Sequence, residues 1–449
     1  MRFLSALCFA TLLGSGIVHA QNAAPPADDL PRHGVAGLAV SPPDLSKPED
    51  SRSNPPMLKA VVPGSAGEAA GLQPGDILLE LDGHPVTTSA AFAQAVSRHL
   101  AGESVRVVVR RDSQQMEKTI VLKPRPFETS ADATVLYRSI TANGVRRRTI
   151  LTRPKSDGRY PAVLFIGGLG CYSLDGDLNR DAGYGPILSA LAKQNFVTMR
   201  VEKTGQGDSE GPACTDLKAT ADLEAAGYVA ALDALRTCDF VDPQKIFVFA
   251  HSLGPLLASL ALPGQNVRGV IAAETVGRSW FEYLLDNVRR QSALVGEPLD
   301  QVDSEVRATA DCAHHLFLQH ETYDEVARIN NSCKEMNASF ASVPYPYMHQ
   351  IGDISLGKQW KQIAAPVLVL YGTSDPATSA EESRYLVQII NSFHPGNATY
   401  RELPGMGHDF AHYDSQLAFL EHAKNPKPHP FDDELLAIMF AWLNQRLSC

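Results

Sequence analysis

Three residues that lie far apart in the sequence have the side-chain types of a nucleophile, a base and an acid. Ser252 comes shortly after the apolar run 246–250, and Asp375 comes shortly after the apolar run 367–371. His408 lies in a glycine-rich segment. A serine hydroxyl becomes an effective nucleophile when a base takes its proton and an acid orients that base. The three residues therefore predict a serine that attacks a carbonyl carbon, with His408 as base and Asp375 as orienting acid.

The residues around Ser252 have the sizes that a sharp strand-to-helix turn requires. Such a turn holds its central residue in a strained backbone and tolerates only small neighbours two positions away. Gly254 meets this need, and Ala250 stands where glycine is more usual. Pro255 falls in the first helical turn, where its missing N–H costs little. We expect Ser252 at the top of this turn; the alternative is an ordinary serine at the start of a helix.

Other residues could take the acid and base roles. The rival acids are Glu274, which follows the preceding strand, and Asp409. The rival bases are His412 and His251, although His251 adjoins the serine and should point elsewhere. A single aspartate after a strand is usually a turn or cap residue, and a single histidine is usually a surface or core residue. The first three residues are favoured because they occur together, and the acid and the nucleophile each follow a strand.

The elements that must position these residues alternate between strand and helix from about residue 134 to 449. A hairpin-like pair comes first, followed by apolar runs typical of parallel strands that are buried on both faces. These runs are 163–166, 196–201, 246–250, 270–273 and 367–371. Helical patterns lie between them at 187–194, 221–237 and 253–262. The fold class predicted is α/β, with a mostly parallel sheet covered by helices.

The part before residue 134 has another pattern. Residues 31–123 read as short strands and turns with one helix at 89–100, and the polar, proline-bearing segment 124–133 reads as a linker. The ordered sequence 61–79 resembles a PDZ domain of the bacterial type. The smaller domain is therefore expected to be β-rich.

The PDZ resemblance implies a peptide site. In such domains the backbone amides of an early loop bind a chain-end carboxylate, and the peptide adds as a strand beside a helix. The corresponding loop contains Val35, Ala36, Gly37 and Leu38, and the glycine permits close approach of a ligand to the backbone. The alternative is that this module only packs against the rest of the chain and binds no free peptide.

Residues 134–449 resemble the α/β-hydrolase superfamily. The order of Ser252, Asp375 and His408 is the one that these enzymes have. A second feature is the segment 202–211, which is similar to a rim loop of esterase-like and serine-aminopeptidase-like members. The resemblance implies a backbone oxyanion hole formed by the residue after the nucleophile and by the loop after an early strand.

The oxyanion assignment rests on that resemblance. The amide of Leu253 follows the nucleophile, and Leu169 is assigned as the second donor, with Gly168 as the alternative. A dinucleotide-binding interpretation of this glycine-rich segment fails because Ser173 stands where the third glycine of that motif is required.

Residues 275–350 are too long for a simple connection between strands. In α/β-hydrolases an insertion here usually forms a helical cap that shapes the substrate pocket and excludes water. His314, His315 and His320 fall in this segment. We expect no metal there, because no carboxylate–histidine spacing accompanies them and a serine triad needs none.

The start of the chain and its cysteines indicate export. Residues 1–20 have one early positive charge, an apolar run and a small-residue cleavage site, which is typical of a signal peptide. The alternative is a membrane anchor, for which the run is short. The predicted location is periplasmic or extracellular, where disulfides form. The pairs favoured are Cys171–Cys214, whose residues follow two neighbouring rim loops, and Cys312–Cys333; Cys238 and Cys449 are the remainder.

The composition and net charge of the chain exclude some classes of binding partner. Of 449 residues, 44% are hydrophobic, as in a folded protein with a large core. The formal net charge is −10, which disfavours a nucleic-acid partner. We predict an exported serine hydrolase that cleaves small carboxylic esters without a cofactor. The alternatives are a peptidase or amidase fed by the PDZ-like groove, and a non-catalytic peptide-binding protein.

Overall fold

The protein divides into two compact units. The computed structural model describes residues 30–40, 55–340, 342–424 and 427–448. The larger unit contains Glu128–Thr204 and Ser209–Cys449, and the smaller contains Ala27–Phe127 together with Gly205–Asp208. The predicted signal peptide 1–20 lies outside the described residues. Within those residues, no helix combines the length and the apolar character needed to cross a membrane.

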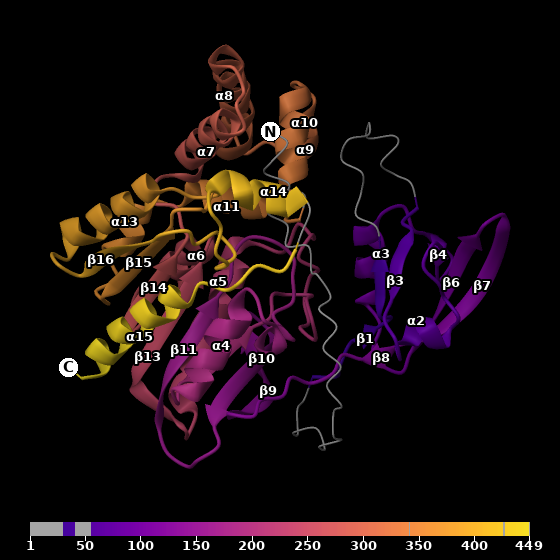
Figure 1. Ribbon diagram of the computed structural model, residues 1–449, viewed down its shortest axis with the longest axis horizontal. Helices are drawn as coiled ribbons and strands as arrows, with labels where there is room; N and C mark the ends of the chain where they lie inside the picture. Colours follow the sequence, from indigo (N-terminus) through magenta and orange to yellow (C-terminus); the bar gives the residue numbers. More distant parts are fainter. Residues whose placement is uncertain (1–29, 41–54, 341, 425–426, 449) are drawn as a thin grey trace. The chain divides into compact units, whose positions relative to one another are not determined.

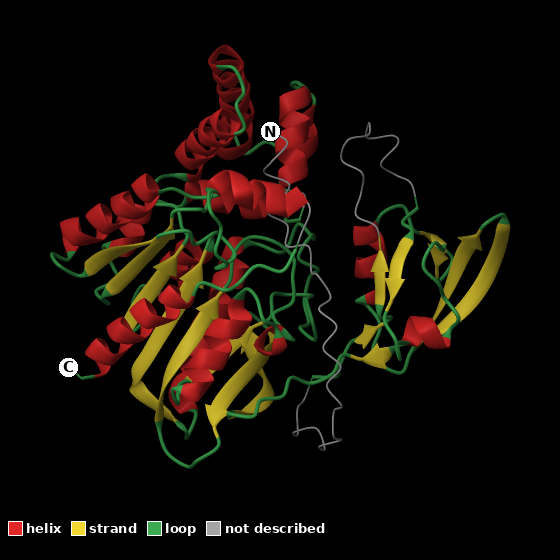
Figure 2. Ribbon diagram, in the orientation of Figure 1, coloured by secondary structure: helices red, strands yellow, loops and turns green. Residues whose placement is uncertain are grey.

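A single eight-stranded sheet forms the centre of the larger unit (Figures 1 and 2), in the order β16-β15-β14-β13-β11-β12-β10-β9. Its strands are β9 (Ala133–Ala142), β10 (Val145–Pro154), β11 (Tyr160–Ile166), β12 (Val197–Val201), β13 (Val241–His251), β14 (Gly269–Ala273), β15 (Val367–Gly372) and β16 (Ala398–Leu403). Neighbours among β11 to β16 pair in parallel, while β10 pairs antiparallel with β9 and β12. The mostly parallel sheet is thus confirmed, with an antiparallel hairpin at one edge.

Helices cover both faces of this sheet, which explains why its central strands are apolar along their whole length. Helices α5 (Ala221–Thr237), α6 (Gly254–Ala261) and α13 (Ala380–Phe393) share one hydrophobic core with one face. Helices α4 (Tyr184–Lys193) and α15 (Asp433–Leu447) share the core on the other face. The carboxyl ends of the parallel strands consequently meet at one edge, where connecting loops can bring distant residues together.

A helical insertion separates β14 from β15. It contains α7 (Trp280–Leu294), α8 (Leu299–Ala313), the π-helical turn η3 (His314–Leu318), α9 (Tyr323–Ala327), α10 (Asn331–Ser339), α11 (Tyr345–Asp353) and α12 (Leu356–Trp360). Ser279 and Glu282 form a capping box that starts α7. The helices continue to Trp360, beyond the predicted limit of the insertion at residue 350. Helix α14 (Gln416–Lys424) follows β16.

The smaller unit is β-rich. Its strands are β1 (Gly34–Val35), β2 (Leu38–Val40), β3 (Leu58–Val61), β4 (Ile77–Leu81), β5 (His84–Pro85), β6 (Ser104–Arg111), β7 (Gln114–Val121) and β8 (Lys123–Pro124). They form the sheets β1-β8, β2-β3 and β5-β4-β6-β7, with helices α2 (Ala66–Ala69) and α3 (Ser89–Val96).

Two local predictions for the smaller unit were wrong. The apolar run 34–40, which by its sequence is predicted to be one strand, is divided into β1 and β2 because Gly37 adopts a left-handed backbone with a φ of 69°. The helix predicted over 89–100 ends at Val96 and is followed by a turn, in which the amide of His99 donates to the carbonyl oxygen of Val96 at 3.1 Å. The carbonyl oxygen of His99 accepts from the amide of Gly34 at 2.9 Å, so the chain after the turn pairs with the start of β1.

Candidate active site

Ser252 lies in the tight turn between β13 and α6. Its φ is 60°, a left-handed conformation that a residue with a side chain rarely adopts. The amide of Ser252 donates to the carbonyl oxygen of Ala273 at 3.0 Å, which ties the turn to the end of β14. A Cβ atom on Gly254 would lie 2.4 Å from the carbonyl oxygen of Ile166, so only glycine fits there. The turn thus holds the serine at the carboxyl edge of the sheet.

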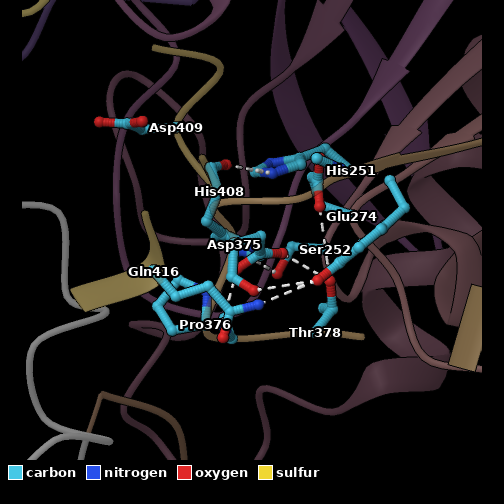
Figure 3. A network of polar contacts seen from close by, with 12 residues as sticks. His251, Ser252, Glu274, Asp375, Pro376, Thr378, His408, Asp409 and Gln416 are labelled. Carbon is cyan, nitrogen blue, oxygen red and sulfur yellow. Dashed lines mark hydrogen bonds and ion pairs between the residues drawn. The ribbon is translucent and has the colours of Figure 1, made fainter. Parts of the chain in front are cut away.

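The structure brings the three predicted residues into one hydrogen-bonded row (Figure 3). The Nε2 atom of His408 lies 3.1 Å from Oγ of Ser252, and its Nδ1 atom lies 2.9 Å from Oδ2 of Asp375. Asp375 is completely buried, and His408 is 4% exposed. When Nδ1 of His408 carries a proton and donates it to Asp375, Nε2 is free to accept the proton of Ser252.

Charge and burial oppose each other at the acid and the base. Burial by itself would raise the pKa of Asp375, but the neighbouring His408 and the hydrogen bonds that Asp375 accepts hold it below its usual range. Burial would lower the pKa of His408, but the Asp375 carboxylate raises it above its usual value. The carboxylate therefore stays ionised and stabilises an imidazolium at position 408.

The loop that carries Asp375 is fixed by short contacts. One carboxylate oxygen of Asp375 accepts from the amide of Ala377 at 2.6 Å, and the other accepts from the hydroxyl of Thr378 at 2.5 Å.

Helix α7 of the insertion also binds the loop that carries Asp375. The side-chain amide of Asn287 donates to the carbonyl oxygen of Ala377 at 2.5 Å, and that of Gln291 donates to Pro376 at 3.1 Å. The insertion thus helps to orient the acid.

His251, a rival base, points away from the nucleophile. Its Nε2 atom lies 2.9 Å from the backbone carbonyl oxygen of His408, and its Nδ1 atom lies 2.8 Å from the hydroxyl of Tyr184. Burial lowers the pKa of His251 well below its usual value, so the ring is neutral. A neutral ring that donates from Nε2 holds the backbone of the neighbouring histidine.

Glu274, a rival acid, lies beside Asp375 at the end of β14 and is fully buried. One oxygen accepts from the amide of Gly372 at 2.7 Å, and the other lies 3.4 Å from the hydroxyl of Thr378. Burial raises the pKa of Glu274 well above its usual value, and the charge of Asp375 raises it further. The site therefore contains two adjacent carboxyl groups, of which Glu274 is the protonated one.

The remaining rivals have partners outside the row. The carboxylate of Asp409 accepts from the hydroxyl of Tyr413 at 2.8 Å and points away from the three residues in Figure 3. The Nδ1 atom of His412 lies 3.3 Å from the carboxylate of Asp432. Neither side chain contacts Ser252 or Asp375 in any hydrogen bond that the described residues form.

Of the predicted oxyanion amides, that of Leu253 follows Ser252 in the chain and that of Leu169 follows Gly168, which lies close to Ser252. A Cβ atom on Gly168 would lie 2.9 Å from the Cβ atom of Ser252, so the segment after β11 passes directly over the nucleophile. Within the described residues, the amides of Leu169 and Leu253 donate to no protein acceptor. Two such N–H groups near a serine match the requirements of an oxyanion hole.

Two disulfides join the cysteine pairs that the sequence favours. Cys171 is bonded to Cys214, and Cys312 is bonded to Cys333. The first links the segment over the nucleophile to the loop after β12, and the second links α8 to α10. Cys238 forms no disulfide with another described residue, and Cys449 lies outside the described part of the chain.

Among the described residues, one group of three side chains is close enough together to hold a metal ion. Glu274, Asp375 and His408 place potential ligand atoms within 4.8 Å of one another. The facing atoms of Asp375 and His408 are hydrogen-bonded to each other, and Glu274 is protonated, so this donor set suits a proton network better than a cation. The histidines of the insertion have separate partners: Gln319 for His314, Glu321 for His315 and Asp353 for His320.

The predicted peptide-binding loop of the smaller unit connects β1 and β2. The carbonyl oxygens of Ala36 and Gly37 accept from the amides of Gly67 and Val62, at 2.8 and 2.9 Å. The amides of Ala36 and Gly37 donate to no acceptor within the described residues. Among those residues, β2 pairs only with β3, so its second edge is unpaired. Val35 and Leu38 flank the loop within β1 and β2.

Sequence reasoning missed several residues that hold the site together. Thr378 lies three positions after Asp375, a spacing that allows its hydroxyl to reach back to the carboxylate. Lys203 belongs to the segment 202–211 that resembles a rim loop, and its ammonium group reaches the carbonyl oxygen of Gly168. Tyr184 supports His251 from a helix remote in sequence. Of these residues, only Thr378 could have been found from the sequence, by its spacing from Asp375.

The fold and the site are those of an α/β hydrolase, with a serine at a strand-to-helix turn on a mostly parallel sheet. Residues 163–422 match the alpha/beta hydrolase family, and residues 57–111 match the PDZ domain. The first match spans more than half of the 449 residues. The chain belongs to the alpha/beta hydrolase family and carries an N-terminal PDZ domain.

Similar proteins cover parts of the chain. Esterase EstD of Thermotoga maritima is 21% identical over 254 residues, which are 56% of this chain and 55% of that protein. A probable periplasmic serine endoprotease, DegP-like, of Marinomonas sp. is 36% identical over 75 residues, 17% of this chain and 16% of that protein. The chain thus spans about half of the first relative and less of the second. Est1E from Butyrivibrio proteoclasticus, solved with ferulic acid, is 18% identical with a TM-score of 0.40 over 64% of this chain and 96% of that one.

Proposed function

We propose that the protein hydrolyses carboxylic esters of modest size through a covalent acyl intermediate on Ser252. The observation that carries this proposal is the hydrogen-bonded row from Ser252 through His408 to Asp375. A strained turn exposes the nucleophile, a buried carboxylate sets the tautomer of the base, and two amides without protein acceptors lie nearby. The base, its orienting acid and the candidate oxyanion donors all serve the reaction at Oγ of Ser252, as acyl transfer requires.

The hydrogen-bonded row supports the following sequence of proton transfers. His408 takes the proton of Ser252 as the serine oxygen attacks the ester carbonyl, and the amides of Leu169 and Leu253 donate to the oxyanion. Collapse of the tetrahedral intermediate breaks the ester bond, and the leaving alkoxide receives the proton from His408. Water then attacks the acyl group, His408 accepts its proton, and the carboxylic acid is released as Ser252 regains a proton.

Chemical labelling tests the nucleophile directly. A fluorophosphonate probe should label the wild-type protein at Ser252 and should not label Ser252→Ala. A panel of chromogenic esters of increasing acyl length, assayed beside aminoacyl amides, distinguishes an esterase from a peptidase. Faster cleavage of amides than of esters would reject the ester assignment. Equal labelling of wild type and variant would reject Ser252 as the nucleophile, and a wild-type protein that is not labelled would favour a non-catalytic peptide-binding protein.

Peptide cleavage is the second candidate, favoured by the PDZ domain. The loop amides of Ala36 and Gly37 without acceptors, together with the open edge of β2, suit a peptide that ends in a carboxylate and adds as a strand. An array of peptide C-termini tests this binding, with C-terminally amidated copies as controls. Binding that is insensitive to amidation would speak against the carboxylate site.

An oxidising location accords with the two disulfides. Disulfides persist in exported proteins and are rare in the reducing cytosol. We place the protein in the periplasm or outside the cell. Fractionation of cells that produce the full chain would test this, and recovery with reduced cysteines in the cytosolic fraction would contradict it.

A further inference from the structure

The peptide between Gly168 and Leu169 lies between the nucleophile and a buried cation. The carbonyl oxygen of Gly168 accepts from Nζ of Lys203 at 2.7 Å and from the hydroxyl of Tyr172 at 3.2 Å. In a planar trans peptide, the carbonyl and the following N–H point in opposite directions. Fixing the Gly168 oxygen therefore fixes the direction of the Leu169 N–H, which is a predicted oxyanion donor.

The cation is itself held by a network that reaches the helical insertion. Lys203 is 6% exposed, and its Nζ atom lies 3.2 Å from Oε1 of Glu224 on α5. The hydroxyl of Tyr228 donates to the same oxygen at 2.9 Å. The hydroxyl of Tyr347, on helix α11, donates to the other Glu224 oxygen at 3.0 Å. A continuous chain of contacts thus runs from α11 to the segment over Ser252.

The buried ion pair of Lys203 and Glu224 is not explained by its contribution to stability. Removing two charges from water is costly, and a buried pair is often no more stabilising than well-packed apolar residues. An ammonium group on a peptide carbonyl also polarises the peptide and strengthens its N–H as a donor. The position of Lys203 behind the Gly168 carbonyl provides this effect where negative charge would develop.

We propose that Lys203 is a positioning residue for the oxyanion hole, and that Glu224 and Tyr347 make its position depend on the docking of helix α11. This inference rests on the proposed ester hydrolysis. Lys203 does not touch the substrate; it acts through the Gly168–Leu169 peptide. Lys203, Glu224 and Tyr347 also line a small cavity, so loss of one partner leaves space for the ammonium to move.

A comparison of esters with thionoesters separates this role from a structural one. The sulfur of a thionoester accepts hydrogen bonds poorly, so its hydrolysis gains less from oxyanion donors. In Lys203→Met, kcat/KM for the ester should fall on the order of ten- to a hundredfold, mostly in kcat. The rate for the thionoester should fall much less, so the ester-to-thionoester ratio should decrease.

Two tyrosines on helix α11 provide a matched pair of variants. Tyr347→Phe removes one hydroxyl from Glu224 and should lower the ester-to-thionoester ratio in the same direction by a smaller factor. Tyr345→Phe, which removes a hydroxyl outside the network, should leave the ratio unchanged. If Lys203→Met fails to fold, the ester-to-thionoester ratio of Tyr347→Phe tests the proposal in its place.

The outcomes are distinct. A ratio that stays at the wild-type value in both Lys203→Met and Tyr347→Phe, while the two substrates slow equally, would overturn the positioning role and leave only a structural one. A wild-type protein that cleaves neither substrate would overturn the proposed function, and the inference with it. A lowered ratio in Tyr347→Phe but not in Tyr345→Phe would support the link to α11.

Discussion

The ring of His251 holds the backbone of His408: its Nε2 atom lies 2.9 Å from the carbonyl oxygen of that residue. The two histidines are 157 positions apart, His251 at the end of β13 and His408 in the segment after β16, and their ring centroids lie 4.9 Å apart. The residue next to the nucleophile therefore supports the base rather than replacing it. This relationship links the strand-to-helix turn to the loop that must deliver the imidazole.

His251→Phe should reduce kcat by about tenfold with little change in KM, because a slightly misplaced base slows proton transfer without affecting substrate binding. Steady-state kinetics on a chromogenic ester would measure both constants. Tyr184→Phe removes only the hydroxyl that contacts Nδ1 of the His251 ring, and should have a smaller effect. A His251→Phe variant with wild-type kcat would contradict the supporting role.

The rate should depend on pH through His408. Asp375 raises the pKa of His408 above its usual value near 6.5, and only the neutral ring can accept the serine proton. Activity should therefore fall as pH decreases through a midpoint above 6.5. Asp375→Asn should lower that midpoint and reduce kcat by about 10³- to 10⁴-fold. A pH profile of kcat/KM for both proteins tests this, and a midpoint that rises in the variant would oppose it.

Glu274 should make the wild-type protein less stable as pH rises. Its usual pKa is near 4.5, and burial raises the pKa in the folded state, so the folded protein binds more protons than the unfolded chain above pH 4.5. Stability should then decrease with increasing pH, by up to about 1.4 kcal/mol per pH unit for one proton. Glu274→Gln, which keeps the shape without the charge, should lose this dependence.

Urea unfolding at pH 5 and pH 8 would measure the effect of Glu274. The difference between the two pH values should be smaller in Glu274→Gln than in wild type, and ester hydrolysis at neutral pH should be largely retained. Equal differences in both proteins would show that Glu274 is ionised in the folded state. A complete loss of hydrolysis would give Glu274 a direct role as the acid.

The bond between Cys312 and Cys333 should stabilise the helical insertion. It closes a loop with a sequence separation of 21, for which chain entropy predicts a loss of about 3 kcal/mol when the bond is removed. Thermal unfolding of the Cys312→Ala/Cys333→Ala double variant should show a lower Tm. Reducing agent should lower the Tm of the wild type more than that of the double variant, which keeps the bond between Cys171 and Cys214. An equal Tm in both proteins would contradict the prediction.

Much of the fold could be predicted because parallel strands buried on both faces have a recognisable sequence. The runs that became β11, β13, β14 and β15 are continuously apolar, and helical patterns separate them. Element ends were less predictable. The run 34–40 has uniform apolar character, but the backbone conformation of Gly37 divides it, and hydropathy does not report a dihedral angle.

By itself, the sequence determined which side chains are available: Ser252 in a turn of small residues, Asp375 after a strand, and His408 in a glycine-rich segment. Those roles follow from local residue sizes and chain order, which a linear sequence contains. Only the tertiary structure decided that Glu274 sits protonated beside the acid, that His251 supports the base, and that Lys203 lies behind the oxyanion peptide. These contacts join loops from different strands, and their direction depends on packing between elements that no local pattern records.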